Sequence, residues 1–394
     1  MISESLKRTV IRLVRSALLN ECGELDKGAD LFSAAKIAKE HQISAILYYG
    51  AAKCGIDKTS EFMQGLFPSV CAQLELSENQ IYESTKIFDS FKANNIDYLP
   101  LKGIIMKGIY PRPEMRHMGD VDILIRPKQY DVIEKLMLGM GYEFEYESDH
   151  ELVWKNGVVT VELHKRIMTS YNVDLYKYFG EGWKFAKKSS KSCEYHFADE
   201  DFYIYLFAHF AKHYRISGIG IKHFLDIWMY RRAKPNMDEV YIQHSLKKLG
   251  LDTFHKYVLN TLSVWFEDGN EDARTEKITD TIFESGEYGK KEITEISNFA
   301  RNAGYGGKND SERRRRVFSA AFPPLRSMKL KYSILEKLPF LLPVFWIVRL
   351  FYVLVFRADD AKAYKNYLNK ITDEEVEERK RELEFVGLGF KDKG

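Results

Sequence analysis

The sequence predicts an α+β protein in which a small mixed β-sheet core with its own helices is flanked by N- and C-terminal helical regions. Apolar residues recur at helical spacing over residues 2–94 and again from residue 200 onward. Residues 95–167 instead form short segments of alternating apolar and polar side chains, which is typical of strands. We therefore expect four parts: an N-terminal helical region (1–94), an α/β core (95–195), a helical domain (196–320) and a C-terminal helical segment with a polar tail (321–394).

The composition is that of a folded globular protein. Of the 394 residues, 45% are hydrophobic and 14% aromatic, and the net charge of +2 indicates no particular partner. Four cysteines without a C-x-x-C pair argue against a zinc cluster or a disulfide framework and favour a reducing compartment. The N-terminal segment lacks the continuous apolar stretch of a secretion signal, so we expect a cytoplasmic protein.

Glycine, proline and asparagine residues mark the ends of the elements expected in the α/β core. Residues 96–103 have the pattern of a strand that ends at Gly103, and a short helix follows. A second strand is predicted over 119–126, and Pro127 suits the first turn of the helix after it. Asn156-Gly157 separates two further strands and is a strong hairpin signal.

Two acids lie one residue apart in the second strand. Strand side chains alternate, so Asp120 and Asp122 point to one face, while Val121, Ile123 and Ile125 point to the other. Neighbouring carboxylates repel each other and are rarely buried without a partner. We therefore expect a basic side chain or a metal ion beside them, unless they lie on an exposed edge strand or form salt bridges to Arg116 and Arg126.

The last strand of the core carries Glu162 and His164, again on one face. If this strand lies beside the strand with Asp120 and Asp122, three carboxylates form an oxygen site suited to Mg²⁺ or Mn²⁺. Two such ions can bracket an in-line phosphoryl displacement, and Glu162 could act as the general base. His164 either contacts substrate or metal, or orients Glu162 through a hydrogen bond.

A phosphate site is predicted upstream of these acids. Gly103 ends a strand and opens a helix, and helix N-termini present free N–H groups to anions. Lys102 and Arg116 add positive charge nearby, although either could form a structural ion pair instead. A strand, a glycine, a helix and then a strand with D-x-D make a coherent site for a nucleoside triphosphate.

These motifs together resemble the nucleotidyltransferase superfamily, and most closely its bacterial branch of uncharacterised nucleotidyltransferases. The resemblance implies a minimal nucleotidyltransferase fold in which Asp120, Asp122 and Glu162 bind the metal ions. It departs from better-known members at Gly103, which is followed by Ile104 where they have serine. The matching motifs are Leu101-Lys102-Gly103, Tyr110-Pro111, Arg116, Gly119-Asp120-x-Asp122 and Val161-Glu162-x-His164.

We accordingly predict Mg²⁺- or Mn²⁺-dependent transfer of a nucleotidyl group from an NTP, such as ATP, to a hydroxyl, with pyrophosphate leaving. Lys102, Gly103, Arg116, Gly119 and His164 are the predicted nucleotide-binding residues. A small molecule, a tRNA 3′ end and a protein side chain remain possible acceptors. The alternatives are an inactive nucleotide-binding or scaffold module and an assembly protein at a membrane surface.

Three features outside the core are ambiguous in the sequence. Residues 338–356 are almost wholly apolar, and we expect a buried helix, with a helix lying on a membrane or a partner, or a membrane span, as alternatives. His209 and His213 share a helix face and are interpreted as core or pocket residues, because no H-E-x-x-H pattern is present. Asp226 is expected to pair with a basic residue, with a pocket role as the alternative.

Overall fold

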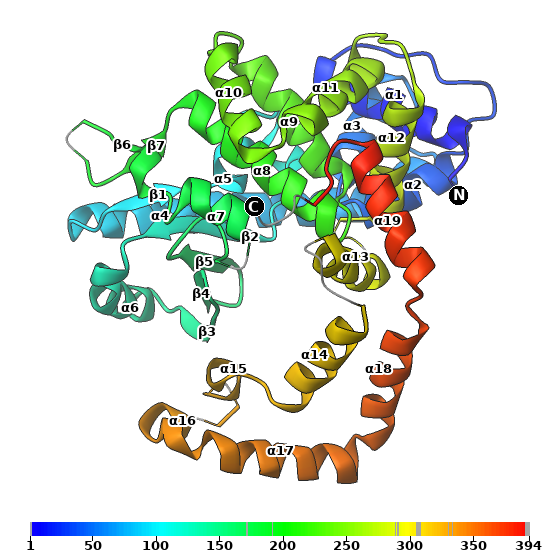
Figure 1. The fold of residues 1–394 in the computed structure, drawn as a ribbon. Coiled ribbons are helices and arrows are strands. Elements are labelled where there is room, and N and C mark those ends of the chain that lie inside the picture. Colours follow the sequence, from blue (N-terminus) through cyan, green and yellow to red (C-terminus); the bar gives the residue numbers. More distant parts are fainter. Residues whose placement is uncertain are drawn as a thin grey trace. The chain divides into compact units, whose positions relative to one another are not determined.

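The computed structural model describes residues 2–170, 172–190, 192–287, 289, 291–304, 309–329, 331–332 and 334–390. The chain forms two compact units, Met1–Lys290 and Lys291–Gly394. The predicted α+β class is confirmed, because the described helices accompany a five-stranded mixed sheet in the first unit (Figure 1). The finer division of the sequence into four parts stays a prediction.

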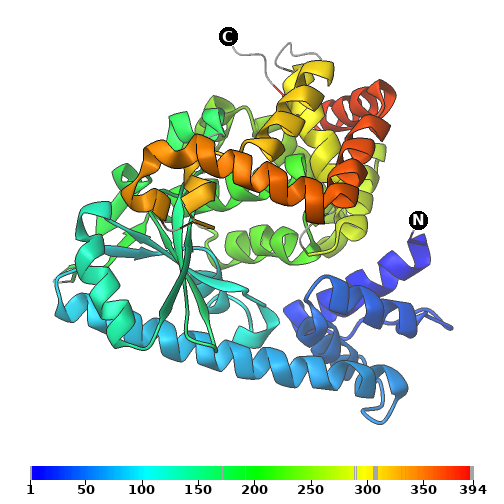
Figure 2. The same ribbon diagram turned by 90° about the horizontal axis from the view of Figure 1, so that it is seen from below.

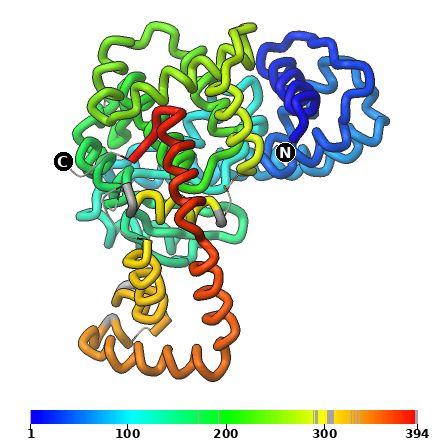
Figure 3. Tube along the Cα trace, turned by 45° about the vertical axis from the view of Figure 1, so that its right-hand side comes forward, coloured from blue at the N-terminus to red at the C-terminus, as the bar shows by residue number. Residues whose placement is uncertain are grey.

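The first unit begins with four helices. Ser3, Asp30 and Ser60 cap three of them by accepting hydrogen bonds from backbone N–H groups of the first turn. The first three helices group together and pack on the long fourth one (Figure 3). The helices are α1 (Glu4–Leu19), α2 (Leu31–Glu40), α3 (Ser44–Lys53) and α4 (Glu61–Ala93).

The sheet has the strand order β1-β2-β5-β4-β3. β2 pairs in parallel with β5, and the other neighbours are antiparallel. The predicted hairpin joins β4 to β5, where Gly157 has a φ of 80° and the Asn156 side chain accepts from the Val158 and Val159 N–H groups. The strands are β1 (Tyr98–Pro100), β2 (Asp120–Ile125), β3 (Glu143–Glu147), β4 (Glu151–Lys155) and β5 (Thr160–His164).

One face of the sheet forms the core of this region. Val121 and Ile123 of β2 and Leu163 of β5 are fully buried there. Ile87 of α4 and Ile133 of α6 (Tyr130–Gly139) pack on the same face, so the alternation predicted for these strands is confirmed. Figure 2 shows the long helix α4 running along the sheet. The opposite face carries the acidic side chains and is therefore free to line a site.

A helical region follows the sheet within the same unit. α8 and α9 pack against each other, and α11 packs on α10 and α12. Its elements, with the short α5 that follows β1, are α5 (Gly103–Lys107), α7 (Val173–Phe179), β6 (Ala186–Lys188), β7 (Tyr195–Phe197), α8 (Asp199–Ile216), α9 (Ile221–Ala233), α10 (Glu239–Leu249), α11 (Asp252–Phe266) and α12 (Ala273–Ser285).

The second unit is helical. The tail that was expected to be polar contains a helix, α19, whose Val376 is fully buried and packs with Phe299 of α13 and Leu368 of α18. Thr372 caps α19 through a capping box with Glu375. The helices are α13 (Lys291–Gly304), α14 (Asn309–Ala321), α15 (Leu325–Lys329), α16 (Ile334–Lys337), α17 (Leu342–Phe356), α18 (Ala358–Lys370) and α19 (Asp373–Phe385).

The expectation of a buried helix over residues 338–356 is wrong. Pro339–Phe356 has a mean hydropathy of 2.1 and is long and apolar enough to cross a membrane, yet none of it is buried. One side of α17 does contact its own unit, since Phe345 packs on Tyr332 and the Trp346 indole N–H donates to the Pro323 carbonyl. The other side is exposed, with Ile347 at 68% and Leu354 at 70%.

His41 joins three parts of the first unit. Its ring is fully buried, with Nε2 3.0 Å from the Phe283 carbonyl and Nδ1 3.2 Å from the Ile221 N–H. The imidazole therefore donates to α12 and accepts from α9. Burial lowers the pKa of His41 to about 4, despite the opposing effect of the hydrogen bond to Phe283.

We expect His41→Leu to lower the free energy of unfolding by about 1–3 kcal/mol at pH 7.5, because the Ile221 N–H loses its acceptor. The folded-state pKa lies below the unfolded value, so the unfolded chain binds the extra proton and the contribution of His41 is lost as the pH falls from about 7 to 4. Urea unfolding at pH 7.5 and pH 5 should therefore show a smaller difference between wild type and variant at pH 5. An equal difference at both values would contradict this account.

Candidate active site

The acidic face of the sheet gathers Asp120, Asp122 and Glu162. β2 and β5 run in parallel with Asp122 directly opposite Glu162, and Asp120 lies two residues earlier on β2. β2 lies between β1 and β5, so these acids are not on an exposed edge strand. The predicted meeting of three carboxylates on one face therefore occurs, and their catalytic role stays a prediction.

Asp122 is the most firmly held of the three acids. It is 3% exposed, and its Oδ1 lies 2.9 Å from Lys102 Nζ and 2.7 Å from His164 Nε2. Burial alone would favour the neutral acid, but these two partners lower its pKa well below the usual range. For His164, burial is outweighed by its hydrogen bonds to Asp122 and Glu162, which raise its pKa to about 9.

The pKa of Asp120 is shifted in the opposite direction to that of Asp122. Burial, followed by repulsion from Asp122 and Glu162, raises the pKa of Asp120 to about 8. The cluster thus holds more negative charge than its protein partners neutralise. Asp122, Glu162 and His164 each place one ligand atom within 4.8 Å of the other two. The two carboxylates of this group, with Asp120 beside them, fit a divalent cation that prefers oxygen ligands.

Lys102 and Gly103 lie next to the acids and line the same cavity, and each also has a structural contact. Lys102 forms the ion pair with Asp122, which is the alternative raised from the sequence. Gly103 begins α5, a helix of only five residues. A Cβ at Gly103 would lie 2.4 Å from the Met118 sulfur, so a larger residue here would require the buried Met118 side chain to move. A phosphate contact at these residues stays a prediction.

Arg116 also forms an ion pair. Its Nε and Nη2 each lie 2.7 Å from a carboxylate oxygen of Asp226 on α9, and its Nη1 donates to the His117 carbonyl. Tyr110 donates to the same carboxylate at 2.9 Å. The expectation that Asp226 pairs with a basic residue is confirmed. The geometry favours the structural alternative for Arg116, because each of its side-chain nitrogens already has an acceptor in the protein.

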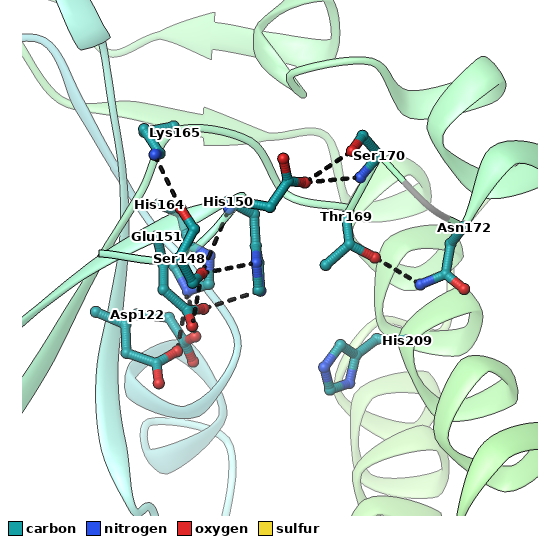
Figure 4. Close-up of polar contacts among 12 residues, drawn as sticks. Asp122, Ser148, His150, Glu151, His164, Lys165, Thr169, Ser170, Asn172 and His209 are labelled. Carbon is teal, nitrogen blue, oxygen red and sulfur yellow. Dashed lines mark hydrogen bonds and ion pairs between the residues drawn. The ribbon is translucent and has the colours of Figure 1, made fainter. Parts of the chain in front are cut away.

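These residues line a cavity of about 330 Å³, which is within the range of small-ligand sites. The acids lie on the sheet side, together with Gly119, which precedes β2. Basic and imidazole side chains of α8 and α9 line the other side, and Figure 4 shows His209 facing Asp122 and His164 from α8. The helical side contributes His209, Lys212, His213, Lys222 and His223.

Sequence reasoning had placed His209 and His213 in the core or a pocket, and the structure puts both in the cavity, with 3.2 Å between their Nε2 atoms. It had missed Lys212, which stands three residues after His209 on the same helix. Burial and then the charge of Lys102 lower the pKa of Lys212 to about 8. In the part of the chain that the structure describes, no ion pair to Lys212 is present. In the sequence, the only indication that Lys212 lines the cavity is its position beside the histidine pair.

Several other cavity residues could not be identified from the sequence. Lys222 and Glu287 form a buried ion pair, His150 lies in the turn before β4, and Glu151 is the first residue of β4. Nothing in the local pattern around them differs from an ordinary helix or strand terminus. Only tertiary contact brings them to the cavity.

We expect Asp226→Ala to lower the free energy of unfolding by about 3–5 kcal/mol, because it leaves the buried Arg116 guanidinium without its counterion. The double variant Arg116→Met/Asp226→Leu should lose less than Asp226→Ala, since no uncompensated charge stays buried. Arg112→Ala is the control, because its side chain is 60% exposed. Urea unfolding monitored by circular dichroism measures all three, and a Asp226→Ala variant as stable as wild type would argue against a structural pair.

Comparison with known proteins gives one match. A family model described as uncharacterised nucleotidyltransferase matches residues 28–267, which include the whole sheet and the helices α8 and α9. No curated protein and no solved structure matches the chain. The match covers more than half of the chain and includes every residue of the acidic cluster, so the chain belongs to the uncharacterised nucleotidyltransferase family.

Proposed function

We propose that this protein transfers a nucleotidyl group from a nucleoside triphosphate to a hydroxyl of an acceptor, with Mg²⁺ or Mn²⁺ and with release of pyrophosphate. The observation that carries the proposal is the polarity of the cavity. Three carboxylates from β2 and β5 line one side, and lysine and histidine side chains of α8 and α9 line the other. A nucleotide triphosphate with its divalent cation has the complementary charges, since the cation suits the acids and the phosphates suit the basic side.

The acidic cluster fits a divalent metal ion. Asp120, Asp122 and Glu162 would hold it. Burial and then repulsion from Asp122 and Glu162 raise the pKa of Asp120, and a cation would relieve that repulsion. When bound, such an ion neutralises charge on the phosphates and makes the acceptor hydroxyl more acidic. Asp122 is fixed by Lys102 and His164, so its orientation is set before any ligand enters.

In the reaction, the acceptor oxygen forms a bond to the α-phosphorus, and the bond from that phosphorus to the oxygen of the β-phosphate breaks. The hydroxyl proton needs a base, and Glu162 is the best placed. It lines the cavity and is partly exposed, whereas Asp122 is already engaged by two cationic partners. Lys212, on the basic side, would neutralise charge on the departing pyrophosphate.

The acceptor is a hydroxyl compound that reaches the same cavity. Four consecutive arginines at 313–316 form the kind of basic run that would suit an RNA acceptor, but three of them are engaged in ion pairs within the second unit. Arg315 and Arg316 pair with Glu312, and Arg313 pairs with Asp310. A small molecule or a protein side chain is therefore the preferred acceptor over a tRNA end, which would need clustered free cations.

The exposed side of α17 is proposed to lie on an anionic membrane surface. Its apolar residues are flanked by Lys331 and Lys337 before the helix and Lys362 after it, which suits a negatively charged lipid surface. The contacts of Phe345 and Trp346 within the unit favour a helix lying on the surface over one that crosses the membrane. The segment 338–356 would then keep the enzyme near the membrane.

We expect one of ATP, GTP, CTP and UTP to bind in the presence of Mg²⁺, and Asp120→Asn/Asp122→Asn to weaken this binding at least about tenfold, because the double variant removes two predicted metal ligands. Isothermal titration calorimetry measures the binding, with circular dichroism to confirm folding. Glu145→Gln is the matched control, because this carboxylate lies on exposed β3 and pairs with Lys155 away from the cavity.

Two outcomes would contradict the proposal. If folded wild type bound none of the four nucleotides, the site would not be a nucleotide site. If a nucleotide bound but no nucleotidylated product appeared by mass spectrometry with candidate acceptors, the inactive binding-module alternative would replace the enzyme.

We expect the full chain to float with vesicles that contain phosphatidylserine and to stay behind with pure phosphatidylcholine vesicles. Ile347→Glu/Phe351→Glu should abolish flotation, since it places two charges on the exposed apolar side of α17, where the side chains are 68% and 67% exposed. Phe32→Glu is the matched control, because Phe32 is 77% exposed in the first unit. Flotation that survives the α17 change, or none by wild type, would remove the membrane proposal.

A further inference from the structure

A second group of potential metal ligands lies in the cavity beside the carboxylates. His150, Glu151 and His164 each place one ligand atom within 4.8 Å of the other two. Figure 4 shows the three side chains together at the end of β4 and β5, next to Asp122. Neither the sequence motifs nor the proposed transfer reaction gives a role to His150 and Glu151.

The fold holds these three residues in place. Glu151 and His164 are directly paired residues of the antiparallel strands β4 and β5, so their side chains share a face. His150 is in the turn before β4, which is closed by a 2.8 Å hydrogen bond from the Ser148 N–H to the Glu151 carbonyl. The His150 carbonyl accepts from the Lys165 N–H at 2.7 Å, which ties the turn to the end of β5.

His164 has one ring nitrogen engaged and one without a partner. Nε2 lies 2.7 Å from Asp122, whereas Nδ1 is buried and has no hydrogen-bond partner within the described ranges. The residue is only 2% exposed, so water does not compensate readily. A histidine that donates one N–H to a carboxylate can bind an ion through its other nitrogen when the ion displaces the proton there, which is a common arrangement at metal sites.

His150 and Glu151 are also positioned to bind an ion. His150 Nε2 lies 2.8 Å from Glu151 Oε2, and an ion between these atoms would replace the proton that they share. The Ser148 hydroxyl lies 3.2 Å from His150 Nδ1 and 3.1 Å from Glu151 Oε1, so both ligands have a supporting contact. Hydrogen bonding of Glu151 to His150 outweighs the effect of burial and lowers the pKa of Glu151 to about 2, which keeps this carboxylate ionised.

We propose that His150, Glu151 and His164 bind a first-row transition-metal ion of the Zn²⁺ or Co²⁺ type, at a site that lies beside the carboxylate cluster and shares His164 with it. Two imidazoles and one carboxylate suit such ions, whereas Mg²⁺ prefers oxygen ligands alone. Three protein ligands leave the fourth position of a tetrahedral ion for water or an oxygen of a bound substrate. The inference does not depend on nucleotidyl transfer, since it concerns binding of the ion itself.

A histidine pair elsewhere in the cavity provides a natural comparison. His209 and His213 on α8 have their Nε2 atoms 3.2 Å apart, so one ring donates to the other. They do not belong to either candidate metal cluster among the described residues. His213→Ala therefore removes a cavity histidine without touching the proposed site.

The test is titration of tag-free, metal-stripped full-length protein with Co²⁺ alone, followed by visible absorption and calorimetry. Wild type should bind Co²⁺ with the visible absorption of nitrogen-containing coordination. His150→Ala and Glu151→Gln should each weaken this binding at least about tenfold, because each removes one ligand. Asp120→Asn and His213→Ala should keep it, and Zn²⁺ should displace Co²⁺ whereas Mg²⁺ should not.

Asp122→Asn gives a second, independent measurement. It keeps all three proposed ligands but replaces the carboxylate that orients His164, so Co²⁺ affinity should fall about 10–100-fold without loss of folding. The proposal is overturned if His150→Ala binds Co²⁺ like wild type, or if His213→Ala abolishes binding. Loss of nucleotide binding in Asp120→Asn with retained Co²⁺ binding would separate this site from the transferase site.

Discussion

The parallel pairing of β2 with β5 is the constraint on which the rest of the first unit depends. It places Asp122 opposite Glu162 and, on the other face, Val121 opposite Val161. A slip by one residue would turn every side chain of β2 to the opposite face, so the carboxylates would enter the core and the valine and isoleucine side chains would line the cavity. The apolar packing of α4 and α6 on one face therefore fixes the position of the acids on the other.

Buried ion pairs are a second feature of the cavity. Lys102 pairs with Asp122, Arg116 with Asp226 and Lys222 with Glu287, and all of these residues line the same space. Burying ions costs solvation free energy, so such pairs are weak evidence for added stability. Their effect is positional, because each pair ties a sheet or loop residue to a partner that is fixed elsewhere in the unit. The groups without such partners, above all Lys212 and the His164 Nδ1 atom, are the ones available to a ligand.

The sequence was informative where a pattern is local. Alternation in β2 and β5 identified both faces of the sheet, and Asn156-Gly157 located the hairpin that brings β4 beside β5. The expected burial of residues 338–356 failed for a physical reason. An apolar segment has the same composition whether it lies in a core, on a membrane or against a partner, so its hydropathy predicts a helix but not its surroundings.

By itself, then, the sequence determined the α+β class, the shared face of Asp120 and Asp122 and that of Glu162 and His164, and the family resemblance that the family model confirmed. The shared faces follow from a spacing of two residues along one strand, and the resemblance follows from short motifs between residues 101 and 164. Only the tertiary structure decided that Arg116 faces Asp226, 110 positions further on, and that α8 supplies the basic side of the cavity. It also decided that His150 meets His164. Such contacts depend on how separate elements pack, and that packing cannot be predicted from the local pattern of side chains along one element.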